Sequence, residues 1–567
     1  MASVAPHEGD RSGKPGENHR LYVRRMHPHA RPAAWLPWWA GFALLIALRV
    51  LWLGAYPVNS DEPQHAHVAW NLAIGGTPYR DAFDNHGPLF GLLYAHYMRW
   101  LGPRADILWW LRLAVIPWYA LALWSSWVMA RRLYTARVAA AGVLLAALMQ
   151  IFFVKMGEFR TDDMWTALWL AALALVVGAH RSVRRGFVAG LCIGAALAVS
   201  QKTLPLLATA LVAGVAAGVA RPVAPAGRRG PALAAIAGGL VVPLAMMAWL
   251  AGRHDLGPAY YDMVAYGLEP TGGPSHLWRQ VTYALVAASI VGAAIVRLRR
   301  DRVAEEASRW RAFLGLQALL YMLLIWVAWP LSTPQDFLPV IPTATLVLVG
   351  AAARPSMGWL GAQSSSAWVV LLAGLEFGWL LHHAPPWRDA LAGERSRLAV
   401  VLRCTAPSDS VMDAKSGAIF RPRPYYPVLE SLELRRLEHG LAPDRIAAAL
   451  VAHDTKVLIP ERLPLPDQAF AARNYLPGTA GVYMAGMWLP ASGTRHRITI
   501  RLPGVYALSD GVHPRQGSVD GGVPASRWML GAGPHWLVVP TGRDLFLIWS
   551  KAWACGWRPR LPSGKPA

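Results

Sequence analysis

A long apolar run, Trp35 to Tyr56, is followed directly by the polar stretch Asn59-Ser60-Asp61-Glu62-Pro63. The run is long enough to cross the hydrocarbon core of a bilayer, which is about 30 Å thick. Two adjacent carboxylates are poor packing material where a membrane helix meets water, and ionisable groups at such places are functional candidates by default. This junction predicts a membrane helix that leads into a functional site at Asp61 and Glu62.

The composition of the whole chain is typical of a helical membrane protein. Of its 567 residues, 54% are hydrophobic and only 16% are charged, which is too little charge for a soluble protein of this length. The net charge of +22 would suggest nucleic acid as the partner of a soluble chain. Here the basic residues lie in short connections between apolar runs, so we expect membrane lipids and no nucleic acid as partners.

Apolar stretches recur through the first two thirds of the chain and predict about eleven transmembrane helices. Their approximate ranges are 35–56, 106–129, 136–154, 164–179, 186–201, 203–220, 231–251, 280–296, 312–330, 338–353 and 366–382. Arginines gather in connections on one side only, at residues 130–135, 180–185, 221–230 and 297–311. The positive-inside rule makes these connections cytoplasmic, so the N-terminus is inside and the chain after about residue 383 is outside.

Three domains follow from this pattern. Residues 1–34 are polar and rich in Pro and Gly, so we expect a disordered cytoplasmic tail. Residues 35–383 form the polytopic α-helical membrane domain. Residues 384–567 are expected to form a soluble extracytoplasmic α+β domain. Its alternating segments after residue 496 predict a small antiparallel β-sandwich.

The first predicted outer loop contains two short helices. Pro63 is tolerated in a first helical turn, so one helix is expected to begin near residue 60 and to end at Gly75-Gly76. Its N-terminal dipole favours the ionised forms of Asp61 and Glu62. A second, amphipathic segment, Leu89–Leu101, is too short to span and is expected at the membrane surface.

The second predicted outer loop contains another acidic helix start. We expect Thr161 to cap the fourth span, which places Asp162 on its first turn. Two acidic helix starts on one face of the membrane can converge on one site. Asp61 with Asp162 or Asp163 is a possible ligand set for a divalent cation, a question that the sequence leaves open.

A series of short motifs on the predicted outer side makes a resemblance clear. They are Asp61-Glu62, Gly75-Gly76-Thr77-Pro78-Tyr79, His86-Gly87-Pro88-Leu89, Arg160-Thr161-Asp162, Lys202 and Leu338-Pro339-Val340-Ile341-Pro342. In this order they resemble the GT-C superfamily of polyprenyl-phosphate-sugar-dependent glycosyltransferases, of the protein O-mannosyltransferase and lipid A aminoarabinose transferase type (family 39). The resemblance covers about residues 35–380. His86 departs from it, because some relatives have Lys there.

The resemblance implies an inverting transfer of a sugar from a polyprenyl phosphate to a lipid, glycan or protein acceptor in the cell envelope. It also implies the inner membrane of a bacterium, with the C-terminal domain in the periplasm. Such a reaction needs a carboxylate base and cations for the departing phosphate. The candidates are Asp61 and then Glu62 as the base; Arg160, Lys202 and His86 for the donor phosphate; and Asp162, Asp163 and Tyr79 for substrate or a metal. Neither the sugar nor the acceptor can be named.

The sequence also allows interpretations other than a glycosyltransferase. A transporter or flippase for a lipid-linked sugar would place ionisable residues near the bilayer midplane, on broken helices of repeated halves. Here the acidic groups gather at the outer surface, which favours an enzyme. Asp61 could also be an ordinary charge at a helix start. Arg49 and Arg112 lie within predicted spans, and we expect them either to snorkel or to pair within the bundle rather than to act on substrate.

The chain has three cysteines, and the sequence leaves open whether two of them form a disulfide. Cys192 falls inside a predicted span and is expected to behave as a small apolar residue. Cys404 and Cys555 lie near the two ends of the outer domain and are either bridged or unrelated buried thiols. A separation of more than about 7 Å between their α-carbons would exclude the bridge.

Overall fold

The computed structural model describes residues 36–178, 182–219, 229–270, 277–300, 306–329, 332–353, 362–491, 494–539 and 543–560. The expected tail, residues 1–34, lies outside the described residues. Parts of three arginine-rich connections, at 179–181, 220–228 and 301–305, also lie outside them. The chain divides into two units, Met1–Leu48 and Arg49–Ala567. The first unit shows only the beginning of helix α2 (Leu36–Leu51).

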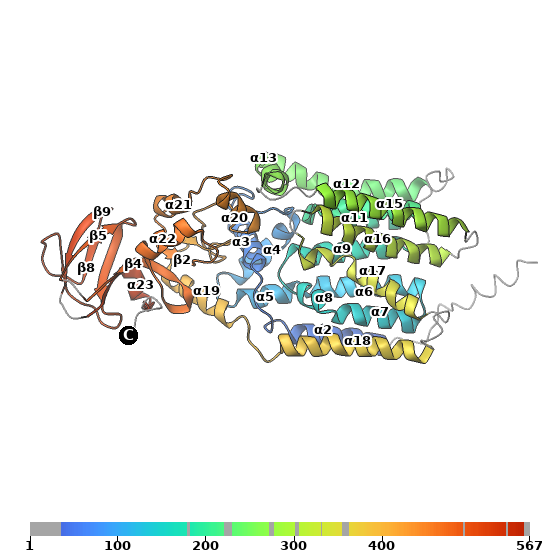
Figure 1. Cartoon of the computed structure of the whole chain (residues 1–567), viewed down its shortest axis with the longest axis horizontal. Helices are drawn as coiled ribbons and strands as arrows, with labels where there is room; N and C mark the ends of the chain where they lie inside the picture. The colour runs from blue at the N-terminus through green and yellow to red at the C-terminus, as the bar shows by residue number, and fades with distance from the viewer. Residues whose placement is uncertain are drawn as a thin grey trace, which may run out of the picture. The chain divides into compact units, whose positions relative to one another are not determined.

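Helices occupy every apolar range expected from the sequence, and in the second unit they lie side by side (Figure 1). They are α5 (Ile107–Ala114), α6 (Ile116–Leu133), α7 (Ala136–Leu148), α8 (Gln150–Lys155), α9 (Thr161–Val176), α10 (Val183–Val199), α11 (Thr203–Ala216), α12 (Arg229–Gly252), α15 (Leu277–Arg300), α16 (Glu306–Ala328), α17 (Ile341–Ala352) and α18 (Ala362–His383). Three described segments are long and apolar enough to cross a membrane: Ile107–Leu133, Arg229–Gly252 and Glu306–Val327. The number of spans therefore stays a prediction.

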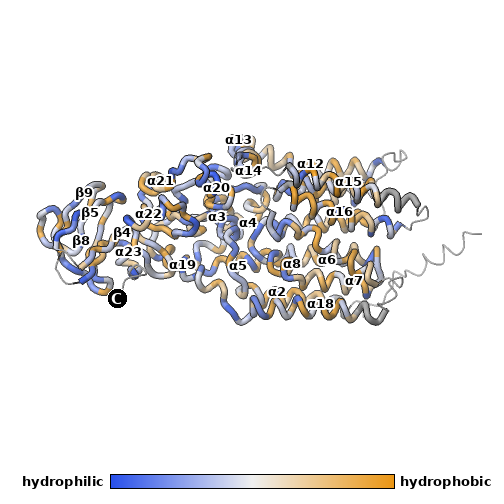
Figure 2. Tube along the Cα trace, in the orientation of Figure 1, coloured by the Kyte–Doolittle hydropathy of each residue, from blue (hydrophilic) through white to orange (hydrophobic). Residues whose placement is uncertain are grey.

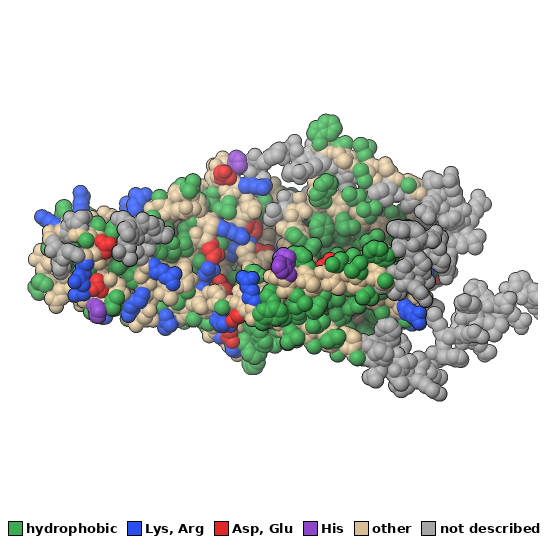
Figure 3. All heavy atoms as spheres, turned by 60° about the horizontal axis from the view of Figure 1, so that its bottom comes forward, with side chains coloured by type: hydrophobic (Ala, Val, Ile, Leu, Met, Phe, Trp, Pro, Cys, Tyr) green, Lys and Arg blue, Asp and Glu red, His purple; other side chains and the backbone are tan. Residues whose placement is uncertain are grey.

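The surface of the helical region is apolar. Hydrophobic residues dominate these helices (Figure 2), and hydrophobic side chains cover much of the helical face drawn in Figure 3. On α12, Leu233, Leu240 and Leu244 are each more than half exposed. Soluble monomers rarely expose large contiguous apolar patches, whereas lipid tails solvate them. This surface is the kind that an integral membrane protein presents to lipid.

Helices α10 and α12 approach closely because glycines lie between them. A Cβ atom on Gly190 would lie 2.1 Å from the carbonyl oxygen of Ala235, and one on Gly238 would lie 2.2 Å from that of Phe187. Small residues permit such close packing of membrane helices, where van der Waals contact is a main source of attraction. Helix α10, packed in this way against α12, leads into the turn that carries Lys202.

The two short helices of the first loop form where the sequence predicted them. Helix α3 covers Asp61–Ala73, and α4 covers Leu89–Leu101. Gly75 follows α3 with φ of +89°, a left-handed conformation that glycine adopts without strain, and it ends the helix. A third short segment follows α12 and consists of α13 (Leu256–Tyr260), the π-helical turn η3 (Tyr261–Ala265) and α14 (Tyr266–Leu268).

The C-terminal region combines helices with two sheets. Its helices are α19 (Ala392–Cys404), α20 (Ser431–Glu438), α21 (Ile446–Ala452), α22 (Leu465–Asn474) and α23 (Ser550–Ala554). Its strands are β1 (Val411–Met412), β2 (Val457–Leu458), β3 (Tyr475–Leu476), β4 (Tyr483–Leu489), β5 (Arg495–Ile500), β6 (Gly504–Ser509), β7 (Ser518–Val519), β8 (Arg527–Leu530), β9 (Gly533–Val538) and β10 (Leu545–Trp549). The larger sheet has the order β1-β2-β4-β10-β6-β8, with β3 paired to β4, and the smaller has the order β5-β9-β7. Strands β1 and β2 are parallel, and the other pairs are antiparallel.

The two sheets share one core, as the predicted β-sandwich requires. Ile498 and Ile500 of β5 and Leu537 of β9 pack in one cluster with Leu508 of β6 and Leu547 of β10. The alternation after residue 496 marked β5 and β9, which are buried mainly on one face, whereas consecutive residues of β6 and β10 are buried. The short strands β3, β7 and β8 were not expected, because two to four residues are too few to show a periodicity.

The structure answers the cysteine question in favour of the bridge. Cys404 at the end of α19 and Cys555 just after α23 form a disulfide, with 5.2 Å between their α-carbons. This separation lies within the usual range for disulfides. Cys192 is free. The disulfide joins the two ends of the C-terminal region.

Candidate functional site

Asp61, the first residue of α3, lies between two cations. Its Oδ2 is 2.6 Å from Nη1 of Arg160, and its Oδ1 is 2.5 Å from Nζ of Lys415. Burial acts to raise the pKa of Asp61, but Arg160 and Lys415 outweigh it and hold the pKa well below its usual range. The side chain remains 24% exposed. Asp61 is therefore an ionised carboxylate that a substrate can reach.

Arg160 connects the two acidic helix starts. Besides Asp61 it contacts Asp162, at 3.0 Å, so the predicted convergence of the two loops is confirmed. The predicted cap was wrong by one residue. Arg160 itself, with extended backbone, is the N-cap of α9, and Thr161 is the first residue of the helix. The Thr161 hydroxyl caps nothing among the described residues.

Lys202 extends the cluster from the turn between α10 and α11. Its Nζ lies 2.5 Å from Asp336 and 3.6 Å from Asp162. Asp336 belongs to the 3-10 turn η4 (Pro334–Phe337), where it forms a capping box with Thr333. The structure thus brings Lys202, a candidate for the donor phosphate, to Asp162, and adds Asp336, which no motif had indicated.

Glu62 has a different environment from its neighbour. It is fully buried, and Arg112 binds both of its carboxylate oxygens at 2.7 Å. The backbone N–H groups of Asn59 and Phe159 donate to the same two oxygens, at 2.9 and 3.1 Å. Protein donors therefore occupy this carboxylate from all sides, and the geometry favours Asp61 over Glu62 as a base. Of the two alternatives for Arg112, pairing inside the bundle is confirmed.

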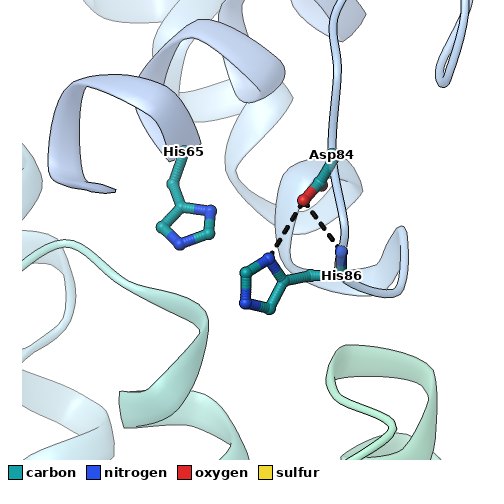
Figure 4. A group of neighbouring side chains, drawn as sticks. All are labelled: His65, Asp84 and His86. Carbon is teal, nitrogen blue, oxygen red and sulfur yellow. Dashed lines mark hydrogen bonds and ion pairs between the residues drawn. The ribbon is translucent and has the colours of Figure 1, made fainter. Parts of the chain in front are cut away.

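His86 lies in the loop before α4, next to two other titratable side chains. Its Nδ1 is 3.1 Å from Oδ1 of Asp84, and its backbone N–H donates to the same oxygen at 3.0 Å. His65 of α3 lies against it, with 4.8 Å between the ring centroids (Figure 4). The neighbouring His67 instead faces the backbone oxygen of Ile419, at 2.9 Å. The two α3 histidines therefore point to different places.

Tyr79 and Gly87 hold the His86 loop in place. The buried Tyr79 hydroxyl donates to the backbone oxygen of His86 at 2.8 Å. Gly87 donates its N–H to Val199 at 3.0 Å, and a Cβ atom there would lie 2.1 Å from the carbonyl oxygen of Ala198. Only glycine fits this close approach. In this arrangement Tyr79 supports the loop.

The two aspartates at the start of α9 differ in their surroundings. Asp162 is shared by Arg160 and Lys202. Asp163 is fully buried, and neither of its carboxylate oxygens has a hydrogen-bond partner among the described residues. Asp162 belongs to the charged cluster, whereas Asp163 points into the packed part of the bundle.

Sequence reasoning missed Lys415 of the C-terminal region. It lies 354 positions from Asp61, and besides Asp61 it contacts Glu430 at 3.1 Å. Asp413 positions the turn that carries it by accepting the backbone N–H groups of Lys415, Ser416 and others. No motif pairs Lys415 with the first loop. Only the three-dimensional fold shows this contact.

Two cavities flank α3, and Lys415 lines both of them. One, of about 580 Å³, is also lined by Trp70, Arg423 and Tyr426. The other, of about 480 Å³, is lined by Asn59, Ser60, Arg462 and further residues. Both volumes lie within the range of ordinary ligand sites. The cluster around Asp61 is therefore next to spaces large enough for a substrate group.

Comparison with known proteins agrees with the fold and the motifs. A family model described as dolichyl-phosphate-mannose-protein mannosyltransferase matches residues 85–249. The structure is similar to that of ArnT from Cupriavidus metallidurans bound to undecaprenyl phosphate (TM-score 0.52, 14% identity, covering 80% of this chain and 98% of that one). The apo state of ArnT gives a TM-score of 0.53 at 15% identity with the same coverage.

A weaker likeness is to the archaeal oligosaccharyltransferase AglB from Archaeoglobus fulgidus (TM-score 0.42, 11% identity, covering 78% of this chain and 73% of that one). No curated protein sequence matches the chain. The family model matches residues 85–249, and the likeness to ArnT shows a common fold; both findings agree with the ordered motifs and with the resemblance to membrane glycosyltransferases.

Proposed function

We propose that this protein is an inverting glycosyltransferase that moves a sugar from a polyprenyl phosphate to a hydroxyl of an envelope acceptor, at the outer face of the membrane. The observation that carries the proposal is the Asp61 cluster, where an accessible, ionised carboxylate lies beside Arg160, which in turn shares Asp162 with Lys202. A base and phosphate-binding cations are the two parts that such a reaction needs. The likeness to ArnT with undecaprenyl phosphate supports this class of donor.

The proposed reaction is a single displacement. The acceptor oxygen attacks the anomeric carbon while Asp61 takes the proton of the acceptor hydroxyl. The bond between the anomeric carbon and the phosphate oxygen breaks, and its electron pair leaves with the phosphate. Arg160 and Lys202 stabilise the negative charge that collects there, and the guanidinium of Arg160 is suited to bidentate contact.

The C-terminal domain takes part in this site in the proposal. Lys415 contacts Asp61 and lines both cavities beside α3. An acceptor that enters either cavity therefore contacts the C-terminal domain (residues 384–567) as well as α3. The contact also requires α3 and the C-terminal domain to lie on the same side of a membrane. This supports the part of the predicted topology that places the first outer loop and the C-terminal domain on one side of the membrane.

The test is an assay of the purified protein in detergent with a panel of undecaprenyl-phosphate sugars and an envelope extract as the acceptor. We expect release of undecaprenyl phosphate together with labelled sugar in the extract, and neither product with the Asp61→Asn variant. A transporter or flippase would move the lipid-linked sugar across liposome membranes without cleaving it. Intact donor under all conditions, with transport in liposomes, contradicts the proposal.

Topology has its own test. A single cysteine at Asn85 should react with a membrane-impermeant thiol reagent from the outside of intact cells, and one at Arg300 should react only after the membrane is opened. Reaction of both from the same side contradicts the proposed orientation.

A further inference from the structure

We propose that His65, Asp84 and His86 form a binding site for a divalent transition metal, with Zn²⁺ as the best match, beside the Asp61 cluster. One nitrogen of each histidine and one carboxylate oxygen of Asp84 lie within 4.8 Å of one another. Two histidines and a carboxylate are ligands that Zn²⁺ takes in sites with three protein ligands, where the fourth position stays open. The part of the inference that concerns the donor phosphate rests on the proposed function.

The side chains come from two elements that pack together. His65 projects from α3, and Asp84 and His86 come from the loop before α4 (Figure 4). His65 and Asp84 are buried, 1% and 5% exposed, and the His86 side chain is 15% exposed. Burial of this degree excludes most of the water that competes for a metal, while His86 leaves an approach from outside.

One polar atom of the group has nothing to bind. Nε2 of His65 is buried and makes no hydrogen bond with any residue in the described part of the chain. A buried polar atom without a partner costs free energy, typically about 1–3 kcal/mol, so each such atom needs an explanation. A metal bound by His65 would supply one. His67, two positions along the same helix, has a protein partner and lies outside the group.

The loop that carries Asp84 and His86 is held from several sides. Asp84 donates its backbone N–H to Asp262 at 3.2 Å, and Tyr79 donates to His86. Asp84 Oδ1 also lies close to Nδ1 of His86, at 3.1 Å. Outer contacts of this kind orient metal ligands in proteins.

The charges of the Asp61 cluster favour a further cation beside it. Arg160 is shared by Asp61 and Asp162, Lys202 by Asp162 and Asp336, and Lys415 by Asp61 and Glu430. Arg160 also lies 3.8 Å from Glu158, so these three cations face five carboxylates, and a divalent ion would add to the positive charge that Arg160 and Lys202 offer a phosphate. His65 is one helical turn from Asp61, so a divalent ion there would add positive charge next to the base.

The same contacts argue against the metal site considered from the sequence. The carboxylates of Asp61 and Asp162 are already bound by Arg160, Lys202 and Lys415. A metal at Asp61 would have to displace these cations. The histidine group requires no such exchange.

The experiment uses the full chain in detergent, stripped with a chelator and titrated with Co²⁺ and then Zn²⁺. We expect about one equivalent of Co²⁺ with the d–d absorption of a four-coordinate site, which Zn²⁺ removes. The double variant His65→Asn/His86→Asn should lose this signal, and His96→Asn, a change at an exposed histidine of α4, should keep it. Absence of the band in the wild type, or an equal band in the double variant, overturns the proposal.

Two further measurements distinguish a misfolded variant from a missing metal site, and a failure of the metal site from a failure of the proposed function. Thermal unfolding of the variants shows whether they fold, and if the double variant does not, the wild-type absorption band alone decides. Binding of undecaprenyl phosphate without any sugar should be about tenfold tighter with Zn²⁺ than after chelation, and equal affinities overturn the link to phosphate. Neither measurement depends on sugar transfer, so a bound metal in a protein that transfers no sugar would contradict the proposed function and leave this site standing.

Discussion

Asp61 and Glu62 are adjacent in the sequence, but they belong to two regions with different physics. Asp61 belongs to an outer region, where it is 24% exposed and shared by Arg160 and Lys415. Glu62 belongs to an inner region, where it and Arg112 are completely buried. Successive side chains on a helix point about 100° apart, so a helix start at the membrane surface sends one carboxylate toward solvent and the next into the bundle.

The difference decides what each carboxylate is able to do. A buried ion pair whose hydrogen bonds are complete has no free acceptor for a substrate, and breaking it leaves an uncompensated charge. Asp61 keeps 24% of its side chain exposed, so a substrate can reach it without entering a completely buried ion pair. We therefore expect chemistry to depend on Asp61 and folding to depend on Glu62, and each change below tests this division.

The largest expected effect is on the reaction. Asp61→Asn removes the proton acceptor at nearly constant shape, and we expect kcat/KM for sugar transfer to fall by about 10²–10⁴-fold. The unfolding temperature in detergent should stay close to that of the wild type. Activity within a few-fold of the wild type would remove Asp61 from the base role.

Glu62→Gln should act on stability. It leaves the Arg112 guanidinium buried without its counter-charge, which typically costs about 3–5 kcal/mol. Thermal unfolding in detergent measures this loss, and the double variant Glu62→Gln/Arg112→Met should recover part of it because the unpaired charge is gone. An unchanged unfolding temperature together with lost transfer would make Glu62 the base and reverse the comparison.

Lys415→Ala should change the outer region more gently. Because Lys415 helps to hold the pKa of Asp61 low, its removal raises that pKa. The acidic limb of kcat/KM against pH should then move to higher pH, so that activity is lost mainly at the acidic end. Lys456→Ala, which removes a lysine that pairs with Asp454 instead, is the matched control. A uniform loss at every pH would show that Lys415 acts on something other than this carboxylate.

The smallest effect is expected at Glu158, which lies between the two regions. Burial, and then the neighbouring Glu62 carboxylate, raise the pKa of Glu158 to about 7 from 4.5. The folded protein thus holds this proton more tightly than the unfolded chain, so stability falls as pH rises from about 4.5 to about 7. Glu158→Gln should therefore stabilise the protein at pH 8, on the order of 1 kcal/mol, and change little near pH 4.5. Equal shifts of the unfolding temperature at both pH values would contradict this assignment.

Local patterns predicted much of the fold and part of the site. The bounds of α4, the start of α3 and the longer strands follow from periodicity, Pro63 and Gly75, which act within a few residues. The convergence of Asp61 and Asp162 followed from two acidic helix starts placed on one face. These features depend on neighbours in the sequence, or on a membrane that sorts loops to one side.

The remaining parts of the site depend on tertiary contacts that no local pattern encodes. Lys415 and Asp336 approach Asp61 and Lys202 from distant segments, and the pairing of Cys404 with Cys555 was open until the fold joined the ends of the domain. The cap at Arg160 was missed because Thr161 is the better capping residue by type. Its hydroxyl lies instead in a buried position.

The bridge between Cys404 and Cys555 has a practical consequence for mapping this molecule. A protease cut anywhere between these two residues leaves the two fragments covalently joined, and only a reducing agent separates them. A cut in any earlier segment releases fragments with or without reductant. Protease treatment of intact cells or of inverted vesicles, followed by paired reducing and non-reducing gels, therefore shows both which side carries the final domain and whether it has been oxidised, with no added label.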